Sequence, residues 1–130
     1  MADESGLDCA GGNASILLVD DDPAVRESLR RVLATEGWKV VPACSGEEAL
    51  ELLLECEPDL IITDLRMAAV SGWDLLFHEQ AQRPRLPIFV VTALSLQAAS
   101  EAAQRATEFF QKPVDLDVLL AAVRRHLGRG

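Results

Sequence analysis

The stretch Ile16-Leu17-Leu18-Val19-Asp20-Asp21-Asp22-Pro23 holds a strand, its end and the start of a helix. A continuous apolar run such as 16–19 is typical of a strand that is covered on both faces. Asp22 is predicted to be the N-cap of the helix that follows, because Pro23 then takes the first helical position. The stretch therefore predicts a buried strand whose carboxyl end is acidic and leads directly into a helix.

The same alternation of strand and helix continues to the end of the chain. Further strands are predicted at 38–41, 59–63, 87–91 and 107–110. A helix follows each strand, the fourth running from about 95 to 105 and the last starting after Asp115. Right-handed crossovers make a doubly wound α/β fold the expected result, with a five-stranded parallel sheet and helices on both faces. We expect the flavodoxin-like strand order 2-1-3-4-5.

Length and composition favour one globular domain. The chain has 130 residues, of which 49% are hydrophobic and 25% charged, and this balance excludes a disordered or fibrous protein. Residues 1–14 carry few large apolar side chains and are predicted to be a disordered tail, which leaves 15–128 for the domain. A net charge of −9 repels polyanions, so we expect no direct binding of nucleic acid.

The cysteines and the N-terminus indicate a cytoplasmic protein. The three cysteines are an odd number without zinc-finger spacing, which argues against disulfides and structural zinc. The first residues are acidic and lack the apolar stretch of a signal peptide, and no apolar run is long enough to span a membrane. We therefore expect a cytoplasmic chain that does not contact membranes.

Chemistry-bearing residues follow four of the predicted strands. They are Asp20 and Asp21, Asp64, Thr92 and Lys112, in chain order. In a doubly wound sheet, ligands bind outside the carboxyl ends of the strands, so these side chains are expected at one edge. Three carboxylates that meet there repel one another, and a hard divalent cation removes that conflict. The pattern predicts a Mg²⁺ site open to solvent.

The same residues fit the transfer of a phosphoryl group. Lys112 supplies a positive charge and Thr92 a hydroxyl donor for phosphoryl oxygens. Asp64 is the candidate nucleophile because its strand lies in the middle of the expected order, whereas Asp20 and Asp21 are better placed as ligands. The predicted product is an aspartyl phosphate.

Four motifs, in this order, resemble those of the receiver domains of two-component response regulators. The resemblance extends from about residue 16 to residue 127. The motifs are Ile16-Leu17-Leu18-Val19-Asp20-Asp21-Asp22-Pro23, then Asp59-Leu60-Ile61-Ile62-Thr63-Asp64-Leu65-Arg66-Met67 with Gly72, then Val91-Thr92-Ala93, and Phe109-Phe110-Gln111-Lys112-Pro113. Each motif alone is weak, but the ordered set is highly specific.

The resemblance implies a phosphoacceptor that belongs to signalling rather than to metabolism. Asp64 would receive a phosphoryl group from a histidine kinase or a histidine phosphotransfer protein. The implied Mg²⁺ ligands are Asp20, Asp21, the Asp64 side chain and the Arg66 backbone carbonyl. Such a domain is not an enzyme in the usual sense, because it promotes only its own phosphorylation and slow dephosphorylation.

The resemblance also implies a conformational switch. Thr92 and Lys112 would contact the phosphoryl oxygens, Thr92 would move toward them and Phe109 would turn inward. Phe109 and Phe110 point to opposite faces of their strand, so only one is the switch, and the motif favours Phe109. The face of the fourth helix, fifth strand and fifth helix would then bind a downstream protein or output domain, or a second copy. The bond between Lys112 and Pro113 is expected to be cis.

Three features depart from the family pattern. Ala68 replaces the usual proline after Met67, and Arg105 replaces a glycine that would end the fourth helix easily. Thr92 and Lys112 are only 20 positions apart, so we expect a shortened or irregular fourth helix. These departures spare the acidic residues but affect the output face.

Three alternatives remain open at the level of sequence. A Mg²⁺-dependent phosphatase with an aspartyl-phosphate intermediate usually has a second acid two residues after its nucleophile, where this chain has Arg66. A flavin carrier would need a phosphate-binding loop after the first strand, where three aspartates would repel the phosphate. A receiver-like interaction module that takes no phosphate is disfavoured by the intact set of site residues.

Overall fold

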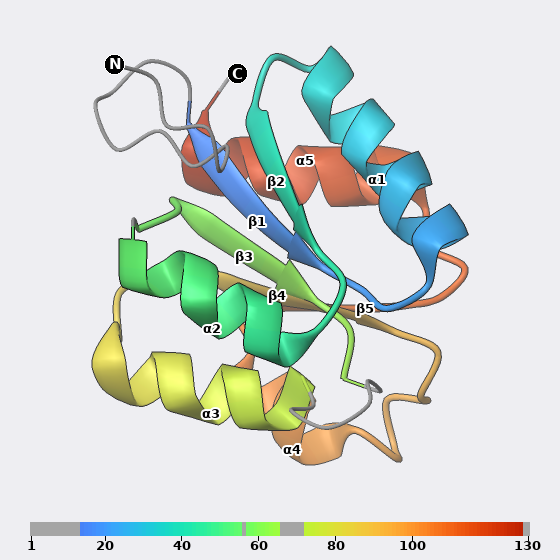
Figure 1. The fold of residues 1–130 in the computed structure, drawn as a ribbon. Helices are drawn as coiled ribbons and strands as arrows, with labels where there is room; N and C mark the ends of the chain where they lie inside the picture. The colour runs from blue at the N-terminus through green and yellow to red at the C-terminus, as the bar shows by residue number, and fades with distance from the viewer. Residues whose placement is uncertain (1–13, 56, 66–71, 129–130) are drawn as a thin grey trace.

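The described part of the chain forms a five-stranded parallel sheet with helices on both faces (Figure 1). The computed structural model describes residues 14–55, 57–65 and 72–128. The elements are β1 Ser15–Val19, α1 Pro23–Thr35, β2 Lys39–Ala43, α2 Gly46–Glu55, β3 Leu60–Thr63, α3 Gly72–Gln82, β4 Ile88–Thr92, α4 Ser100–Arg105, β5 Glu108–Gln111 and α5 Leu116–Leu127. The strand order β2-β1-β3-β4-β5 confirms the predicted flavodoxin-like fold.

Two separate apolar layers hold the helices on the sheet. Alternate residues of each strand point to opposite faces, so Leu17 packs on the side of α2, α3 and α4 and Leu18 on the side of α1 and α5. Figure 1 shows this division, with α2, α3 and α4 grouped away from α1 and α5. Phe89 of β4 is fully buried between the sheet and α5. Because both faces are covered, the central strands are mostly apolar, and their polar residues Ser15, Thr63 and Thr92 stand at strand ends.

Aspartates cap α1 and α5: the Asp22 cap is as the sequence predicts, and α5 starts after Asp115 as expected. Asp22 Oδ1 accepts hydrogen bonds from the backbone N–H groups of Ala24 at 3.0 Å and Val25 at 3.4 Å. The carboxylate of Asp115 accepts from the N–H groups of the second and third residues of α5 in the same way. These bonds satisfy donors that have no partner within the helix, and they fix where each helix begins.

Replacing Asp22 by Ala is expected to lower the free energy of unfolding by about 1 kcal/mol, because two N–H groups of the first turn of α1 lose their acceptor. Urea denaturation at neutral pH measures this change. Glu51→Ala, in the exposed middle of α2, is the control and is expected to stay within about 0.5 kcal/mol of the wild type. An unchanged stability for Asp22→Ala would contradict the capping role.

The fourth helix is shorter than the sequence predicts. The prediction placed its start near Ser95, but α4 begins at Ser100 and has six residues. The hydroxyl of Ser95 accepts from the N–H of Ala98 at 3.1 Å, so it closes a local turn that precedes the helix. Arg105 ends α4, and the next residue is extended rather than left-handed. The expectation of a shortened fourth helix is confirmed, and the predicted start is wrong.

Strand boundaries differ from the predictions by one or two residues. The second strand was predicted at 38–41 but β2 spans Lys39–Ala43, because its last residues pair with the end of β1. Trp38 precedes the strand and is buried against α1 and α5. The fifth strand is shifted by one residue toward Lys112. Positions 1–13 of the predicted tail lie outside the described residues.

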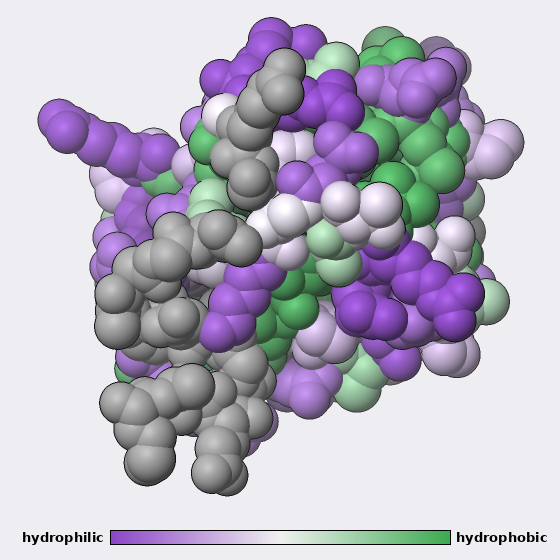
Figure 2. All heavy atoms as spheres, turned by 90° about the horizontal axis from the view of Figure 1, so that it is seen from above, coloured by the Kyte–Doolittle hydropathy of each residue, from purple (hydrophilic) through white to green (hydrophobic). Residues whose placement is uncertain are grey.

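The described surface mixes polar and apolar areas. Seen from above, hydrophilic side chains cover much of it, and a hydrophobic area lies among them at the upper right (Figure 2). Within the described ranges, no helix has both the length and the apolar character that a membrane span requires.

Candidate functional site

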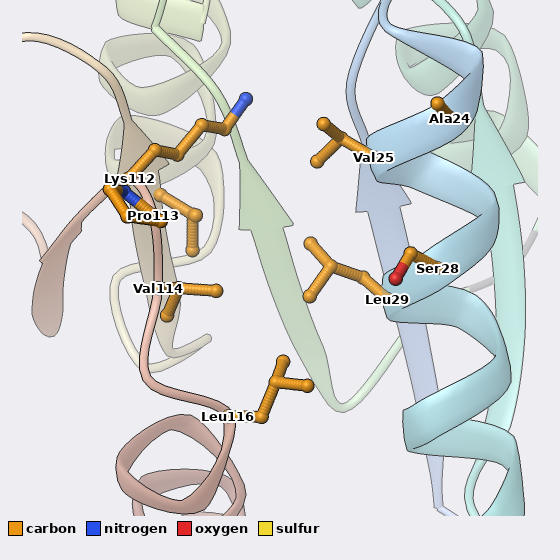
Figure 3. A pocket seen from close by; sticks show the side chains of 9 residues that line it. Ala24, Val25, Ser28, Leu29, Lys112, Pro113, Val114 and Leu116 are labelled. Atoms are coloured by element: carbon orange, nitrogen blue, oxygen red, sulfur yellow. The ribbon is translucent and has the colours of Figure 1, made fainter.

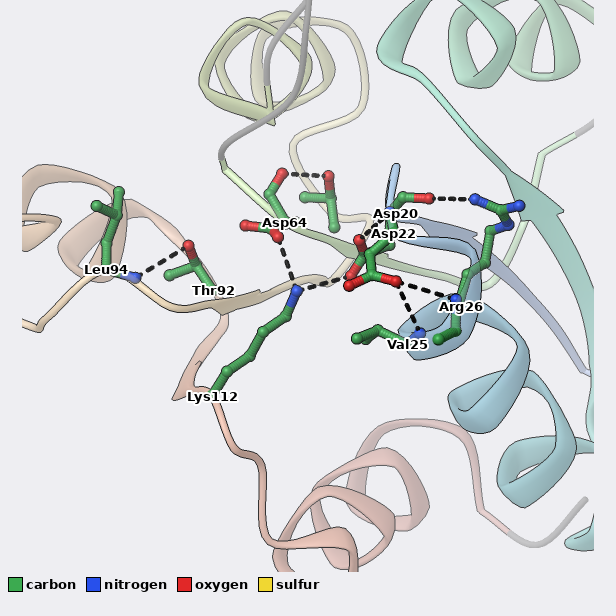
Figure 4. Close-up of polar contacts among 10 residues, drawn as sticks. Asp20, Asp22, Val25, Arg26, Asp64, Thr92, Leu94 and Lys112 are labelled. Atoms are coloured by element: carbon green, nitrogen blue, oxygen red, sulfur yellow. Dashed lines mark hydrogen bonds and ion pairs between the residues drawn. The ribbon is translucent and has the colours of Figure 1, made fainter.

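Asp20 is held firmly at the carboxyl end of β1. Its backbone N–H donates to the carbonyl of Ala43 at 3.1 Å, and its Oδ1 accepts from the N–H of Asp22 at 2.9 Å. Arg26 of α1 donates to the Asp20 carbonyl oxygen at 2.7 Å (Figure 4). The Asp20 side chain is 3% exposed. Two of these contacts hold the backbone of Asp20, and the N–H of Asp22 holds its carboxylate.

Asp64 is the matching residue after β3. Its backbone N–H donates to the carbonyl of Val19 at 3.1 Å, which continues the pairing of β3 with β1. The hydroxyl of Thr63 donates to the Asp64 carbonyl oxygen at 2.9 Å. The Asp64 side chain is 9% exposed, so its carboxylate is largely shielded from solvent.

Lys112 joins these two aspartates. Its backbone N–H donates to the carbonyl of Thr92 at 2.7 Å, which holds the end of β5 beside β4. Its Nζ lies 2.9 Å from Asp20 Oδ2 and 2.8 Å from Asp64 Oδ2 (Figure 4). Parallel pairing thus brings together three residues that directly follow β1, β3 and β5 and are far apart in the sequence. The predicted convergence of Asp20, Asp64 and Lys112 is confirmed.

Asp21 differs from the other two acids because it is exposed. The chain bends at Asp21 directly after β1, which leaves Asp20 buried and Asp21 exposed. Within the described residues, no group of three or more acidic, His or Cys side chains is close enough to hold a metal ion. The structure therefore brings together two of the three predicted carboxylates, with an ammonium group between them.

The donor set nevertheless fits Mg²⁺. This ion prefers oxygen ligands, keeps several of its waters and is commonly held by only one or two carboxylates. Asp20 and Asp64 are buried, and the Oδ2 atoms of both contact the same Lys112 ammonium. The two carboxylates therefore lie close together and concentrate negative charge in one place. Asp21 is adjacent in the chain and exposed. Arg66, the predicted backbone ligand, and Ala68 lie outside the described residues.

The pKa of Lys112 is raised above its usual value of 10.5. Partial burial of the ammonium acts in the opposite direction, because it favours the neutral amine. Hydrogen bonds to Asp64 and Asp20, together with the negative charges of both, outweigh this desolvation. Lys112 therefore stays charged at neutral pH and above.

This raised pKa predicts how stability depends on pH. A group that binds its proton more tightly in the folded state contributes its full stabilisation below the unfolded pKa, and loses it as the pH rises through the folded pKa. The stability difference between the wild type and Lys112→Met should therefore be constant from pH 7 to about 10 and decrease at higher pH. Urea denaturation across this range measures it. A difference that already disappears by pH 8 would contradict the raised pKa.

Thr92 ends β4 and Phe109 lies in β5, and their roles in the predicted switch stay predictions. Thr92 is buried at the end of β4, and its hydroxyl oxygen accepts from the N–H of Leu94 at 3.3 Å. The same hydroxyl carries a proton that it can donate. Phe109 packs on the face of α2, α3 and α4, and Phe110 on the face of α1 and α5. The expected opposite orientation of these two phenylalanines is confirmed.

Arg26 is a site residue that the sequence analysis missed. Its side chain donates to the backbone carbonyl of Asp20. Every residue type has this carbonyl, so the identity of residue 20 does not indicate the contact. Its position four residues after the helix cap Asp22 is the only available indication, because it places Arg26 in the first turn of α1.

An apolar cavity adjoins the acidic edge. Its volume is about 590 Å³, and it lies between α1 and the segment that joins β5 to α5. Figure 3 shows Val25 and Leu29 of α1 across from Val114 and Leu116. Lys112 lines one end of the cavity. The surface on this side of the acidic site is therefore uncharged along much of its length.

Comparisons with known proteins show the family of the chain. The family model of the response regulator receiver domain matches residues 16–124. The transcriptional regulatory protein GlrR of Escherichia coli is 41% identical over 112 residues, which cover 85% of this chain and 25% of GlrR. The response regulator MprA of Mycolicibacterium vanbaalenii is 39% identical over 116 residues, which cover 88% of this chain and 50% of MprA.

Solved structures show the same fold. A response regulator receiver protein from Pseudomonas putida is 35% identical with a TM-score of 0.81, and the match covers 89% of this chain and 99% of that one. The response regulator TrrA from Thermotoga maritima, solved in complex with Mg²⁺-BeF, is 32% identical with a TM-score of 0.81. That match covers 88% of this chain and 99% of TrrA.

The curated relatives are longer than this chain, which spans from about a quarter to about half of their length. One of them is named as a transcriptional regulatory protein, so the expectation that no nucleic acid is bound is not borne out. The match over residues 16–124 and the identities near 40% nevertheless agree on one assignment. The chain belongs to the receiver domains of two-component response regulators.

Proposed function

We propose that this receiver domain accepts a phosphoryl group on the carboxylate of Asp64. The observation that carries the proposal is the Lys112 ammonium, which lies 2.8 Å from Asp64 Oδ2 and 2.9 Å from Asp20 Oδ2. It places a permanent positive charge beside an oxygen that is to become bonded to phosphorus. The donor is the phosphohistidine of a histidine kinase or a histidine phosphotransfer protein.

The transfer is a substitution at phosphorus. An oxygen of Asp64 forms the new P–O bond while the P–N bond of the phosphohistidine breaks, and its electron pair stays on the imidazole nitrogen, which takes up a proton. Lys112 stabilises the negative oxygens of the phosphoryl group, and the Thr92 hydroxyl donates a hydrogen bond to one of them after leaving Leu94. Both residues act without forming a covalent bond.

Mg²⁺ is the cofactor that we propose for this reaction. Asp20, Asp64 and the exposed Asp21 would hold it, with the backbone carbonyl of Arg66 as a further ligand. When bound, the ion supplies positive charge that offsets the charges of the carboxylates and of the phosphoryl group. Arg26 and the N–H of Asp22 keep Asp20 in place for this role.

Phosphorylation is proposed to change the conformation of a surface that binds partners. We infer that the movement of Thr92 lets Phe109 turn inward and changes the face formed by α4, β5 and α5. A downstream protein, an output domain or a second copy of the chain binds that face. The chain is a signalling domain, and its own phosphorylation and slow dephosphorylation are the only reactions that we assign to it.

A phosphatase with the same intermediate is the second candidate. It would need a group that activates water for rapid attack on the aspartyl phosphate. The position two residues after Asp64 is Arg66, which does not act as a general base. This residue favours a stable phosphoaspartate over multiple turnover.

The dependence on Mg²⁺ provides the test of the proposal. Incubation of the chain with acetyl phosphate and Mg²⁺ is expected to add one phosphoryl group, which intact-protein mass spectrometry detects. Chelation of the metal should prevent the addition. Equal uptake with and without chelator would contradict the metal site, and repeated hydrolysis of phosphate monoesters would favour the phosphatase.

A further inference from the structure

A second cavity lies between α2 and α3, away from the phosphoacceptor edge. Its volume is about 490 Å³, and the residues that line it come from the C-terminal parts of both helices and the segments after them. In a parallel α/β sheet the helices run opposite to the strands, so this groove is near the end of the sheet that is opposite Asp64. Figure 1 shows α2 and α3 side by side, and they contact each other. We call this cavity the α2–α3 groove.

An exposed leucine forms one edge of the α2–α3 groove. Leu54 is 89% exposed, although it belongs to a helix whose neighbouring Leu53 is buried in the core. Leu50, one turn earlier on α2, is partly buried and lines the same cavity. A single exposed apolar residue is ordinary on a protein surface. An exposed leucine at the border of a cavity, however, can contact an apolar side chain of a partner that enters the cavity.

The border of the groove is acidic. Helix α2 carries Glu47, Glu48, Glu51 and Glu55 and no basic residue. Glu51 lines the groove, as does Glu57 just after the helix. Glu47, Glu51 and Glu55 are four residues apart and lie on one stripe of α2, next to Leu54. The groove therefore combines an apolar centre with a negative border.

The arginine in the groove does not cancel this charge. Arg83 is paired with Glu79, a residue that is 1% exposed, and donates to the carbonyl oxygen of Leu53 at 3.0 Å. Its Nε also lies 3.5 Å from Glu57. Arg83 thus ties α3 to the end of α2 and is already satisfied by groups of this chain. Of the carboxylates that line the groove, exposed Glu51 is the one that no described group of this chain engages, so it can meet a partner of opposite charge.

We propose that the α2–α3 groove binds a basic peptide segment of a partner protein, which places an aliphatic side chain beside Leu50 and Leu54 and a Lys or Arg side chain against Glu51. The complementary charge also argues against a second copy as the occupant. Two copies of the chain repel each other, because each has a net charge of −9. Its exposed Arg124 is also already paired with Glu36 of the same chain at 2.8 Å. The proposal does not rest on phosphoryl transfer, because the groove shares no residue with that site.

The test uses the full chain and a fluorescent amphipathic helical peptide that carries leucines on one face and lysines and arginines elsewhere. Fluorescence anisotropy is expected to show saturable binding, and amide shifts in NMR spectra should be confined to α2, α3 and the segment after α2. Leu54→Asp should weaken binding about tenfold or more, because the apolar contact is lost. Leu96→Asp is the matched control, since Leu96 is 59% exposed but lies outside the groove.

Charge and shape are tested separately. Glu51→Lys should weaken binding of the same peptide severalfold, and higher salt should reduce the effect. A peptide of the same composition with its leucines distributed around the helix should bind more weakly. Equal binding of both peptides, or equal losses in the Leu54 and Leu96 variants, would overturn the proposal, since binding would then be unspecific attraction to an acidic surface. Self-association that Leu54→Asp removes would overturn it in favour of a second copy.

Discussion

Asp64→Asn is expected to abolish phosphoryl uptake, with a rate at least about a thousandfold below that of the wild type. The amide has nearly the shape of the carboxylate but lacks the negative oxygen that attacks phosphorus. The variant is expected to fold, since its backbone N–H still pairs with Val19 and its side-chain oxygen can still accept from Lys112. Incubation with acetyl phosphate and Mg²⁺, followed by intact mass measurement, gives the result.

A matched control lies at the other end of the same strand. Asp59 precedes β3, and its Oδ2 accepts from the N–H of Ser15 at 2.8 Å. Asp59→Asn keeps an acceptor oxygen for that bond, so it makes the same chemical change far from the site. We expect normal uptake in this variant. Loss of uptake in both variants would indicate a general effect on the fold, and unchanged uptake in Asp64→Asn would remove Asp64 as the acceptor.

Lys112→Met is expected to lower the free energy of unfolding by about 2 to 4 kcal/mol at pH 7, because it leaves two buried carboxylates without the charge that lies between them. The Lys112 side chain is 19% exposed, which places the expected loss in the lower part of the range for buried ion pairs. Saturating Mg²⁺ should restore part of the stability, since ligand that binds only the folded state stabilises it. Urea denaturation with and without Mg²⁺ measures both effects.

The only other lysine of the chain serves as the control. Lys39 begins β2, at the opposite end of the sheet from Asp20. Lys39→Met is expected to change stability by about 1 kcal/mol or less, and Mg²⁺ should not affect that change. Equal losses for the two variants, or a loss in Lys112→Met that Mg²⁺ leaves unaltered, would contradict the proposed electrostatic role.

Much of the fold was predictable because it depends on local patterns. The apolar strands, the cap Asp22, the helix start after Asp115 and the alternation of elements depend on short stretches of sequence, and the structure confirms them. The convergence of Asp20, Asp64 and Lys112 followed from topology, since the carboxyl ends of parallel strands share one edge. The order of the four sequence motifs also indicated the family of receiver domains.

Other features depend on geometry that no short stretch encodes. Asp21 was grouped with Asp20 by type, but the direction of the chain after β1 leaves it exposed. The Lys112 ammonium was expected near the phosphoryl group, and its position between two carboxylates depends on the pairing of three strands. The predicted start of the fourth helix near Ser95 was wrong because Ser95 closes a turn and α4 begins only at Ser100. Arg26 acts on a backbone oxygen, so its residue type gave no indication.

The most direct test of the central claim is to locate the phosphoryl group on the chain. Reduction of the phosphorylated protein with borohydride converts an aspartyl phosphate into a homoserine residue, which tandem mass spectrometry of the proteolytic peptides can place at a single position. The structure predicts this conversion at Asp64, where the Lys112 ammonium meets the carboxylate. Conversion at Asp20 or Asp21, or a phosphoryl group found on a histidine instead, would contradict it.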